Sequence, residues 1–260
     1  MKSATLYVPV SAIDYYKSTY PWSEFGTILP IDEHYSQTPV QNVGELNNRQ
    51  IYTAVTKRAA WYVPTGSTQL ETTEVPTFVY KNSTSSNQQF AFIQHNRQYY
   101  IYCVGEGKIL NGQTSNNPNR GMLVTEDCQP VTITETGDEE YPLFFSYGEN
   151  FNINVGGGNQ ITIDHWSTLD DGNKVALRPV QGVTLSDKEM RSIIGYIDGY
   201  LLGDANGDGN IEIGDITSVL TLMANPDATG YNNKAADANK SGGIEIGDIT
   251  TILTIMAGGE

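Results

Sequence analysis

"GDANGDGNIEIGDITSVLTLMA" occupies residues 203–224, and a near copy, "DANKSGGIEIGDITTILTIMA", occupies residues 237–257. Each copy begins with a loop rich in Asp, Asn and Gly and continues into an apolar run. Equivalent residues of the two copies are 33 positions apart. One loop followed by one helix cannot bury its own apolar face, whereas two such units can bury each other's. The sequence therefore predicts a small C-terminal module made of two matching halves.

Residues with side-chain oxygens recur at alternate positions of each loop, which is the pattern of a calcium-binding loop. Ca²⁺ takes roughly six to eight oxygen ligands, and a Gly at the sixth position lets the seventh carbonyl face the ion. Gly209 and Gly242 occupy this sixth position. Two Ca²⁺ sites are therefore predicted. The ligands of the first are Asp204, Asn206, Asp208, Asn210 and Asp215, and those of the second are Asp237, Asn239, Ser241, Gly243 and Asp248.

The two predicted sites differ at the fifth loop position. The first loop has Asp208 there and the second has Ser241, so the second site has one carboxylate fewer. Because the affinity of such loops for Ca²⁺ depends on the charge of the ligands, we expect the second site to be weaker. Glu212 and Glu245, at the ninth position, are expected to contact the ion through water.

Behind each loop, apolar residues recur with the spacing of one helix face. This spacing, i, i+3, i+4 and i+7, predicts two amphipathic helices whose apolar faces pack together about a pseudo-twofold axis. The predicted faces are Ile216, Val219, Leu220 and Met223 in the first copy, and Ile249, Ile252, Leu253 and Met256 in the second.

The duplicated loop and helix of residues 201–260 resemble the type I dockerin. In that family the twelfth loop position is Asp rather than Glu, as in Asp215 and Asp248. The resemblance implies a Ca²⁺-dependent module that attaches an extracellular protein to a cohesin-like partner.

Two features depart from the dockerin pattern. The Ser-Thr pair that often precedes the twelfth position is replaced by Ile213-Gly214 and Ile246-Gly247. The basic pair expected at positions 17 and 18 is replaced by Leu220-Thr221 and Leu253-Thr254. The alternative is that the module contacts only its own chain, which it terminates and stabilises.

The middle of the chain, residues 34–183, has short apolar runs broken by Gly, Asn and Asp, a pattern typical of an all-β domain. It also repeats: "NRQIYTAV" begins at Asn48 and "NRQYYIYC" begins 48 residues later. The segment from Glu149, "ENFNINVGGG", resembles a third copy. Three units of this length indicate a β-trefoil-like domain. Trp61 aligns with Ile109 of the next unit and is expected in the core.

The three units are similar to ricin-type lectin domains, in which each unit has a Gln-x-aromatic strand. Gln88-Gln89-Phe90 matches this motif, and the other two units lack it. The resemblance implies a glycan as ligand, and it places Cys103 and Cys128 where the family has a disulfide. The alternative for the cysteines is two buried thiols.

Residues 1–33 resemble the terminal unit of a bacterial surface leucine-rich repeat array, with a "TLYVP" strand, a Tyr-rich helix and a "WxxF" turn. The alternative is an ordinary strand and helix. Residues 184–260 are predicted to hold a linking helix and the dockerin-like module. Ser186 followed by Glu189 is a capping box that predicts the start of this helix. The predicted fold class is thus multidomain and mainly β, with a β-trefoil-like domain followed by a small helical, duplicated EF-hand-like module.

The net charge of −15 and the absence of a basic stripe argue against nucleic-acid binding. No apolar run is long enough to cross a membrane. Asp164-His165-Trp166 has no nucleophile motif beside it, so no catalytic residue is predicted, and Trp166 is either a sugar platform or a core residue. His34 and His95 are expected at the surface or in turns.

The predicted function is non-catalytic: calcium-dependent attachment by the C-terminal module, joined to a β-trefoil with a glycan as candidate ligand. We expect the chain to be the C-terminal part of a secreted or cell-surface bacterial protein. Two alternatives stay open. The chain is either an accessory part of an extracellular glycoside hydrolase or protease whose catalytic domain lies upstream, or a purely structural adhesin segment.

Overall fold

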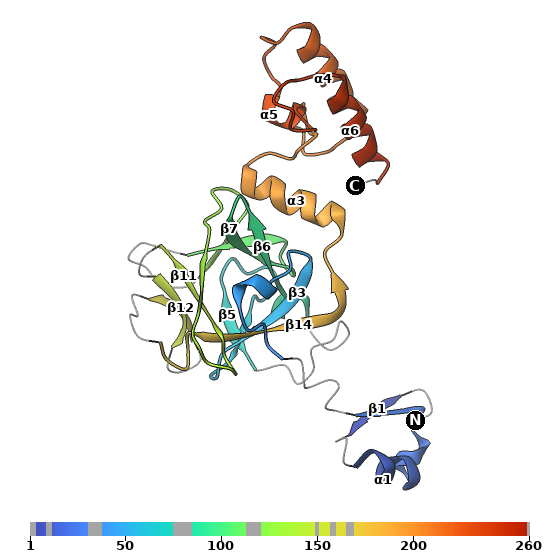
Figure 1. Cartoon of the computed structure of the whole chain (residues 1–260), viewed down its shortest axis with the longest axis vertical. Helices are drawn as coiled ribbons and strands as arrows, with labels where there is room; N and C mark the ends of the chain where they lie inside the picture. Colours follow the sequence, from blue (N-terminus) through green and yellow to red (C-terminus); the bar gives the residue numbers. More distant parts are fainter. Residues whose placement is uncertain are drawn as a thin grey trace.

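The computed structural model describes residues 4–8, 12–30, 38–74, 85–112, 121–148, 151–156, 160–164 and 169–258. Within these ranges, twelve strands of the middle region form one curled sheet (Figure 1). They are β3 (Gln50–Val55), β4 (Ala60–Tyr62), β5 (Glu71–Thr73), β6 (Phe90–His95), β7 (Gln98–Cys103), β8 (Lys108–Asn111), β9 (Met122–Val124), β10 (Thr132–Glu135), β11 (Leu143–Tyr147), β12 (Phe151–Gly156), β13 (Gln160–Asp164) and β14 (Lys174–Thr184). Short 3₁₀ turns, η3 (Val43–Glu45) and η4 (Ser86–Gln88), precede β3 and β6.

Six of these strands close into a ring. β3 pairs with β6, β6 with β7, β10 with β11, β11 with β14, and β14 returns to β3. A bridge between Tyr99 and Val131 joins β7 to β10. The other six strands form three hairpins, β4–β5, β8–β9 and β12–β13. A closed ring leaves no open sheet edge. Six barrel strands and three hairpins in threefold repetition make a β-trefoil, which confirms the β-trefoil-like fold predicted for the middle of the chain.

The barrel encloses an aromatic core to which each unit contributes. Trp61, from the first unit, is fully buried, as its alignment predicts. Its ring lies 5.8 Å from that of Phe90 in the second unit and 5.4 Å from that of Phe145 in the third. Both contacts are edge-to-face, the arrangement that aromatic pairs favour. The three units of the β-trefoil therefore meet at Trp61 in the core.

Cys103 and Cys128 are both free thiols, so the disulfide implied by the ricin-type resemblance is not formed. Cys103 is buried inside the barrel, whereas Cys128 contacts a separate apolar cluster outside it. The sheet lies between the two side chains. Cys128 instead donates a hydrogen bond from Sγ to the Tyr196 carbonyl, at 3.4 Å.

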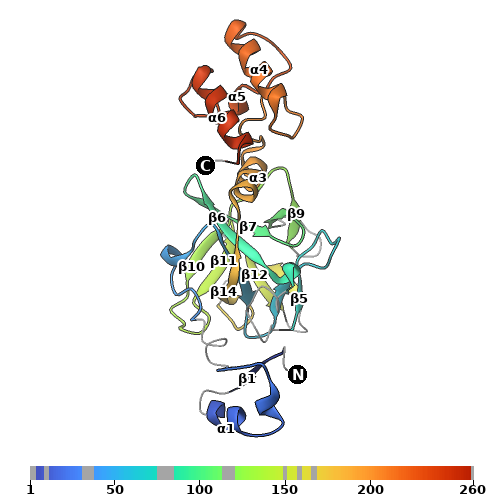
Figure 2. The same ribbon diagram turned by 90° about the vertical axis from the view of Figure 1, so that its right-hand side faces the viewer.

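The linking helix α3 (Asp187–Asp198) begins at the predicted capping box and ends at Gly199, which adopts a left-handed conformation. Its buried face packs on the outside of the barrel around Ile193 (Figure 2). Arg49 forms an ion pair with Asp187 at the start of the helix. At its end, His95 Nε2 lies 2.7 Å from Asp198 Oδ1, so His95, which ends β6, has a partner. Helix α3 is therefore fixed to the barrel at both ends.

The C-terminal module contains α4 (Ile213–Ala224), α5 (Asn233–Ala236) and α6 (Ile246–Met256). The predicted apolar faces are only half right. The residues of the module core include Ala205, Val219, Leu222, Ala236, Ala238 and Ile252, with Ile216 and Ile249 partly buried beside them. By contrast, Leu220, Met223, Leu253 and Met256 are exposed. Each helix also turns its buried Asp inward: Asp215, Val219 and Leu222 of α4 are buried, as are Asp248 and Ile252 of α6.

The N-terminal unit holds β1 (Thr5–Val8) parallel to β2 (Thr27–Pro30), with α1 (Ile13–Ser18) and a 3₁₀ turn, η2 (Trp22–Glu24), between them. Figures 1 and 2 place it at the opposite end of the molecule from the C-terminal module. The predicted order of strand, helix and turn is confirmed, and the leucine-rich repeat origin stays a prediction. Of the helices that the structure describes, none is long and apolar enough to cross a membrane.

Candidate calcium-binding loops

Loop 1, residues 204–215, curls around the side chain of Asp204. Asp204 Oδ1 accepts hydrogen bonds from the N–H groups of Gly207 (2.8 Å) and Asp208 (3.1 Å), and Oδ2 accepts one from Gly209 (2.8 Å). Gly209 has φ +87°, a conformation that favours glycine, as its sixth loop position requires. The carboxylate of the first loop position is thereby held at the centre of the turn.

Asp215, in the first turn of α4, closes loop 1 from the other side. Its Oδ1 accepts a hydrogen bond from the N–H of Asn206 (3.1 Å) and its Oδ2 one from Glu212 (2.8 Å). The side chain is fully buried. This one carboxylate therefore joins both arms of the loop to the start of the helix.

Loop 2, residues 237–248, repeats most of this network; the N–H of Lys240, equivalent to that of Gly207, donates to the Asp237 main-chain carbonyl instead. Asp237 accepts from the N–H groups of Ser241 (2.9 Å) and Gly242 (3.0 Å). Asp248, also fully buried, accepts from those of Asn239 (3.0 Å) and Glu245 (2.7 Å). Equivalent donors and acceptors in the two loops are again 33 residues apart, so the sequence repeat corresponds to a repeat in the hydrogen bonding.

The fifth position distinguishes the loops. Asp208 accepts from the Asn210 N–H and from Asn206 Nδ2, both at 2.9 Å, and these hydrogen bonds, that of Asn210 first, lower the pKa of its carboxyl. In loop 2, Ser241 Oγ instead donates to the Gly243 carbonyl at 3.2 Å. The predicted order of affinities, with loop 1 tighter, stays a prediction.

The donor set of the loops fits Ca²⁺. The predicted ligands bind through oxygen alone: carboxylates, side-chain amides, one hydroxyl and main-chain carbonyls. Asp215 and Asp248 are buried, and in the described part of the chain no Lys, Arg or His forms an ion pair with either. The backbone N–H groups satisfy their oxygens as acceptors but supply no opposite charge, and burying a charge without one is costly, so a bound cation is the natural counter-charge.

The acidic side chains alone do not form a cage. Over the described ranges, no group of three or more Asp, Glu, His or Cys side chains is gathered in a way that could hold a metal ion. The neutral ligands Asn206, Asn239, Ser241 and the carbonyls of Asn210 and Gly243 would therefore have to complete both sites.

Two glycines belong to the loops although the ligand pattern does not include them. A Cβ on Gly247 would lie 2.6 Å from Asn239 Nδ2, and one on Gly214 would lie 3.1 Å from Asn206 Nδ2. Glycine at the eleventh position thus lets the Asn of the third position approach the helix. The signal in the sequence is that this glycine recurs at the same place in both copies.

The helices behind the loops each expose an uncharged strip. The apolar strips are Ile213, Leu220 and Met223 on α4 and Ile246, Leu253 and Met256 on α6. Ile213 is 67% exposed and its equivalent Ile246 is 70% exposed. The only charged residue within each helix is the buried Asp, so neither strip contains a charge.

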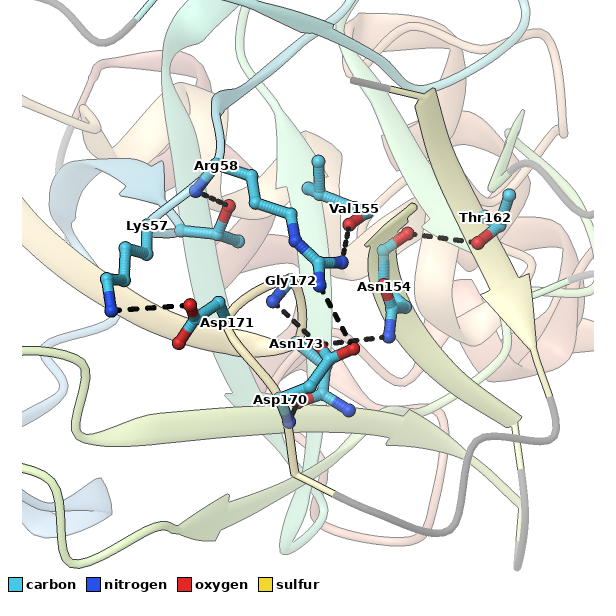
Figure 3. Close-up of polar contacts among 10 residues, drawn as sticks. Lys57, Arg58, Asn154, Val155, Thr162, Asp170, Asp171, Gly172 and Asn173 are labelled. Atoms are coloured by element: carbon cyan, nitrogen blue, oxygen red, sulfur yellow. Dashed lines mark hydrogen bonds and ion pairs between the residues drawn. The ribbon is translucent and has the colours of Figure 1, made fainter. Parts of the chain in front are cut away.

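A separate polar cluster lies on the barrel (Figure 3). Arg58 donates from Nη1 to the Val155 carbonyl at 2.6 Å and pairs with Asp170 at 3.3 Å. The Asp170 carboxylate also accepts from the Gly172 N–H at 2.7 Å. These contacts join the turn after β3 to β12 and to the loop before β14. Because its groups are satisfied by one another, the cluster serves the barrel rather than a ligand.

Among the other candidate residues, Gln89 and Phe90 of the ricin-type motif are buried, and Phe90 belongs to the barrel core. Asp164 ends β13, opposite Asn152. His34, His165 and Trp166 lie outside the described residues.

No family model and no curated protein matches the chain. Solved structures similar to it include a ricin B-like lectin of Macrolepiota procera in complex with lactose, with 12% identity and a TM-score of 0.42, covering 52% of this chain and 98% of that one. The Rhizoctonia solani agglutinin has 11% identity and a TM-score of 0.40, covering 50% and 95%. A designed threefold-symmetric protein, ThreeFoil, has 17% identity and a TM-score of 0.39, covering 49% and 97%. The β-trefoil description rests on the strand pairing given above.

Proposed function

We propose that the C-terminal module is a calcium-dependent, non-catalytic attachment module carried by the β-trefoil. One observation supports this above all. Each acidic loop ends in a fully buried carboxylate, Asp215 or Asp248, and the same residue lies in the first turn of a helix that exposes an uncharged apolar strip. The groups that would hold the ion are thus the groups that orient the strips.

In this proposal Ca²⁺ supplies the positive charge that the buried carboxylates lack. The loop residues hold the ion, and the two helices are thereby fixed against each other. An ion that binds only the folded module stabilises it by RT ln(1 + c/Kd), where c is the free ion concentration; this is about 2.7 kcal/mol per site at a hundredfold excess over Kd. This is a large share of the stability of a domain with so small a core.

The apolar strips are the surfaces we assign to a protein partner. They stand out because the chain has a net charge of −15 and yet neither strip contains a charge. Following the dockerin resemblance, the partner is a cohesin-like protein outside the cell. Since Ile213 and Leu220 replace polar residues of the family pattern, that partner would present an apolar surface.

A glycan is the candidate ligand of the β-trefoil on the sequence resemblance alone. Gln89 and Phe90 are buried, so they support the barrel and offer no surface to a sugar. We therefore assign the proposed function to the C-terminal module.

Calorimetric titration of the full chain with CaCl₂ tests the proposal. We expect two sites, the tighter one lost in Asp204→Ala and the weaker one in Asp237→Ala. Asp227→Ala, which removes an acid of the module outside the loops, is the matched control and should keep both sites. Failure of the native chain to bind Ca²⁺ at millimolar concentration would overturn the proposal.

A further inference from the structure

A hollow of about 730 Å³ separates loop 1 from the first turns of α3. Lys188, Arg191 and Asp187 of α3 line it on one side, and Gly209, Asn210 and Glu212 of loop 1 line it on the other. The charge of Asp187 is paired with Arg49. Because α3 is fixed to the barrel, these cations face the loop from a rigid support.

Of the two cations, Lys188 lines only the hollow next to loop 1. It is exposed, and among the described residues it takes part in no ion pair. Arg191 also lines a second hollow, of about 470 Å³, together with Ala238 of loop 2. A charge at Arg191 is therefore shared between the two loops, whereas Lys188 lines only the hollow next to loop 1.

The two loops thus have different electrostatic surroundings. Loop 1 contains four acids and no cation of its own, and loop 2 contains three acids and Lys240. A cation outside loop 1 repels an incoming Ca²⁺ through solvent, and the repulsion weakens with distance and with salt.

We propose that Lys188, held by the barrel-bound helix α3, lowers the calcium affinity of loop 1 and leaves that of loop 2 unchanged. This inference rests on the proposed function, because it presumes that the loops bind Ca²⁺.

The test uses calorimetry on the full chain, with each loop measured alone. The Asp237→Ala background leaves only loop 1, and the Asp204→Ala background leaves only loop 2. In low salt, Lys188→Gln should raise the affinity of loop 1 roughly two- to fourfold and should not change that of loop 2. Lys188→Arg, which keeps the charge, should restore the native affinity.

Lys17→Gln, the same charge change in the N-terminal unit, is the matched control and should have no effect. In about 0.5 M NaCl the difference between Lys188→Gln and the native residue should vanish, because screening acts over a few ångströms there. A change that persists in high salt, or equal affinities in low salt, overturns the inference. If the native chain binds no Ca²⁺ at all, the proposed function itself fails, so the two failures are distinguishable.

Discussion

Arg58 and Asp170 lie 112 residues apart in the sequence, and their ion pair, Nη2 to Oδ2 at 3.3 Å, joins the first unit of the β-trefoil to the third. The pair lies beside Gly172, where a Cβ would overlap the Val155 carbonyl oxygen and the Arg58 guanidinium. The close approach of these three segments completes the barrel where its last strand begins.

Replacement of Arg58 should destabilise the barrel. Arg58→Ala leaves the Val155 carbonyl and the Asp170 carboxylate without this donor, and hydrogen bonds to charged groups contribute about 1.5–3 kcal/mol each. Lys57→Ala is the control, because the Lys57–Asp171 pair is more than half exposed on both sides and should contribute at most about 1 kcal/mol. Urea unfolding measures both, and equal losses would contradict the assignment.

Trp61 should be the most costly of the described tryptophans to truncate. Trp61→Ala removes the ring that contacts all three units, and such core truncations cost about 3–5 kcal/mol. Trp22, which is 39% exposed in the N-terminal unit, is the comparison, and Trp22→Ala should leave barrel unfolding unchanged. Thermal unfolding followed by circular dichroism, at a wavelength that reports on β-structure, would show the difference in melting temperature between the two variants.

The two cysteine thiols should differ strongly in how fast an alkylating reagent modifies them. Burial raises the pKa of both, and that of Cys128 is raised to about 11, while Cys103 is enclosed in the barrel. Alkylation of Cys128 in the folded chain should therefore be slow at neutral pH and should accelerate as the pH rises toward 11. Cys103 should react only after unfolding.

The raised pKa of Cys128 also makes the stability of the fold depend on pH. A folded-state thiol pKa above the unfolded value contributes stability that is fully present below pH 9 and is lost as the pH rises through about 11. A Cys103–Cys128 cross-linked peptide in mass spectrometry would contradict the free thiols.

Exchanging the residues at the fifth loop position should reverse the order of the Ca²⁺ affinities of the two loops. Asp208→Ser gives loop 1 the ligand set of loop 2, and Ser241→Asp does the reverse. We expect a roughly tenfold loss of Ca²⁺ affinity in the first case and a gain of similar size in the second, about 1.4 kcal/mol each. Calorimetry in the single-loop backgrounds measures both changes. If both substitutions change the Ca²⁺ affinity in the same direction, the number of carboxylates does not set the order of the two affinities.

Chelation should loosen the C-terminal module and leave the barrel intact. Without an ion, Asp215 and Asp248 stay buried without a counter-charge, whereas no predicted ligand lies in the barrel. Hydrogen exchange with and without chelator should show faster exchange in α4 and α6 and unchanged protection in β6 and β7. Faster exchange throughout the chain would mean that the barrel also depends on the ion.

Repetition made the loops and the barrel predictable. The copies around Asp204 and Asp237 fix the register of the predicted calcium ligands, and those at Asn48 and Asn96 fix the length of a β-trefoil unit. Such repeats can be recognised locally, because the residues of one copy lie within a few dozen positions of their equivalents in the next.

Contacts between distant segments left no such signal. Nothing near Arg58 indicates that its partner is Asp170, and the helix periodicity that selects Leu220 and Met223 cannot tell which side of α4 faces the core. The buried Asp215 decides that rotation, and a charged residue is not expected inward by an apolar pattern. The ricin-type placement of the cysteines failed for a related reason. Alternation along β7 turns Cys103 into the barrel, whereas Cys128 lies in the loop between β9 and β10 and contacts the cluster outside it.

The barrel begins and ends at neighbouring places: Gln50, which opens β3, is paired with Thr184, which closes β14. Because these strands are antiparallel, tension between the N-terminal unit and the C-terminal module would separate the two strands from this end, one hydrogen bond after another. The Leu185–Arg49 backbone hydrogen bond, at 2.8 Å, and the Arg49–Asp187 ion pair lie at the point where that opening would start. The junction that fixes α3 to the barrel would thus be the first contact to resist such tension.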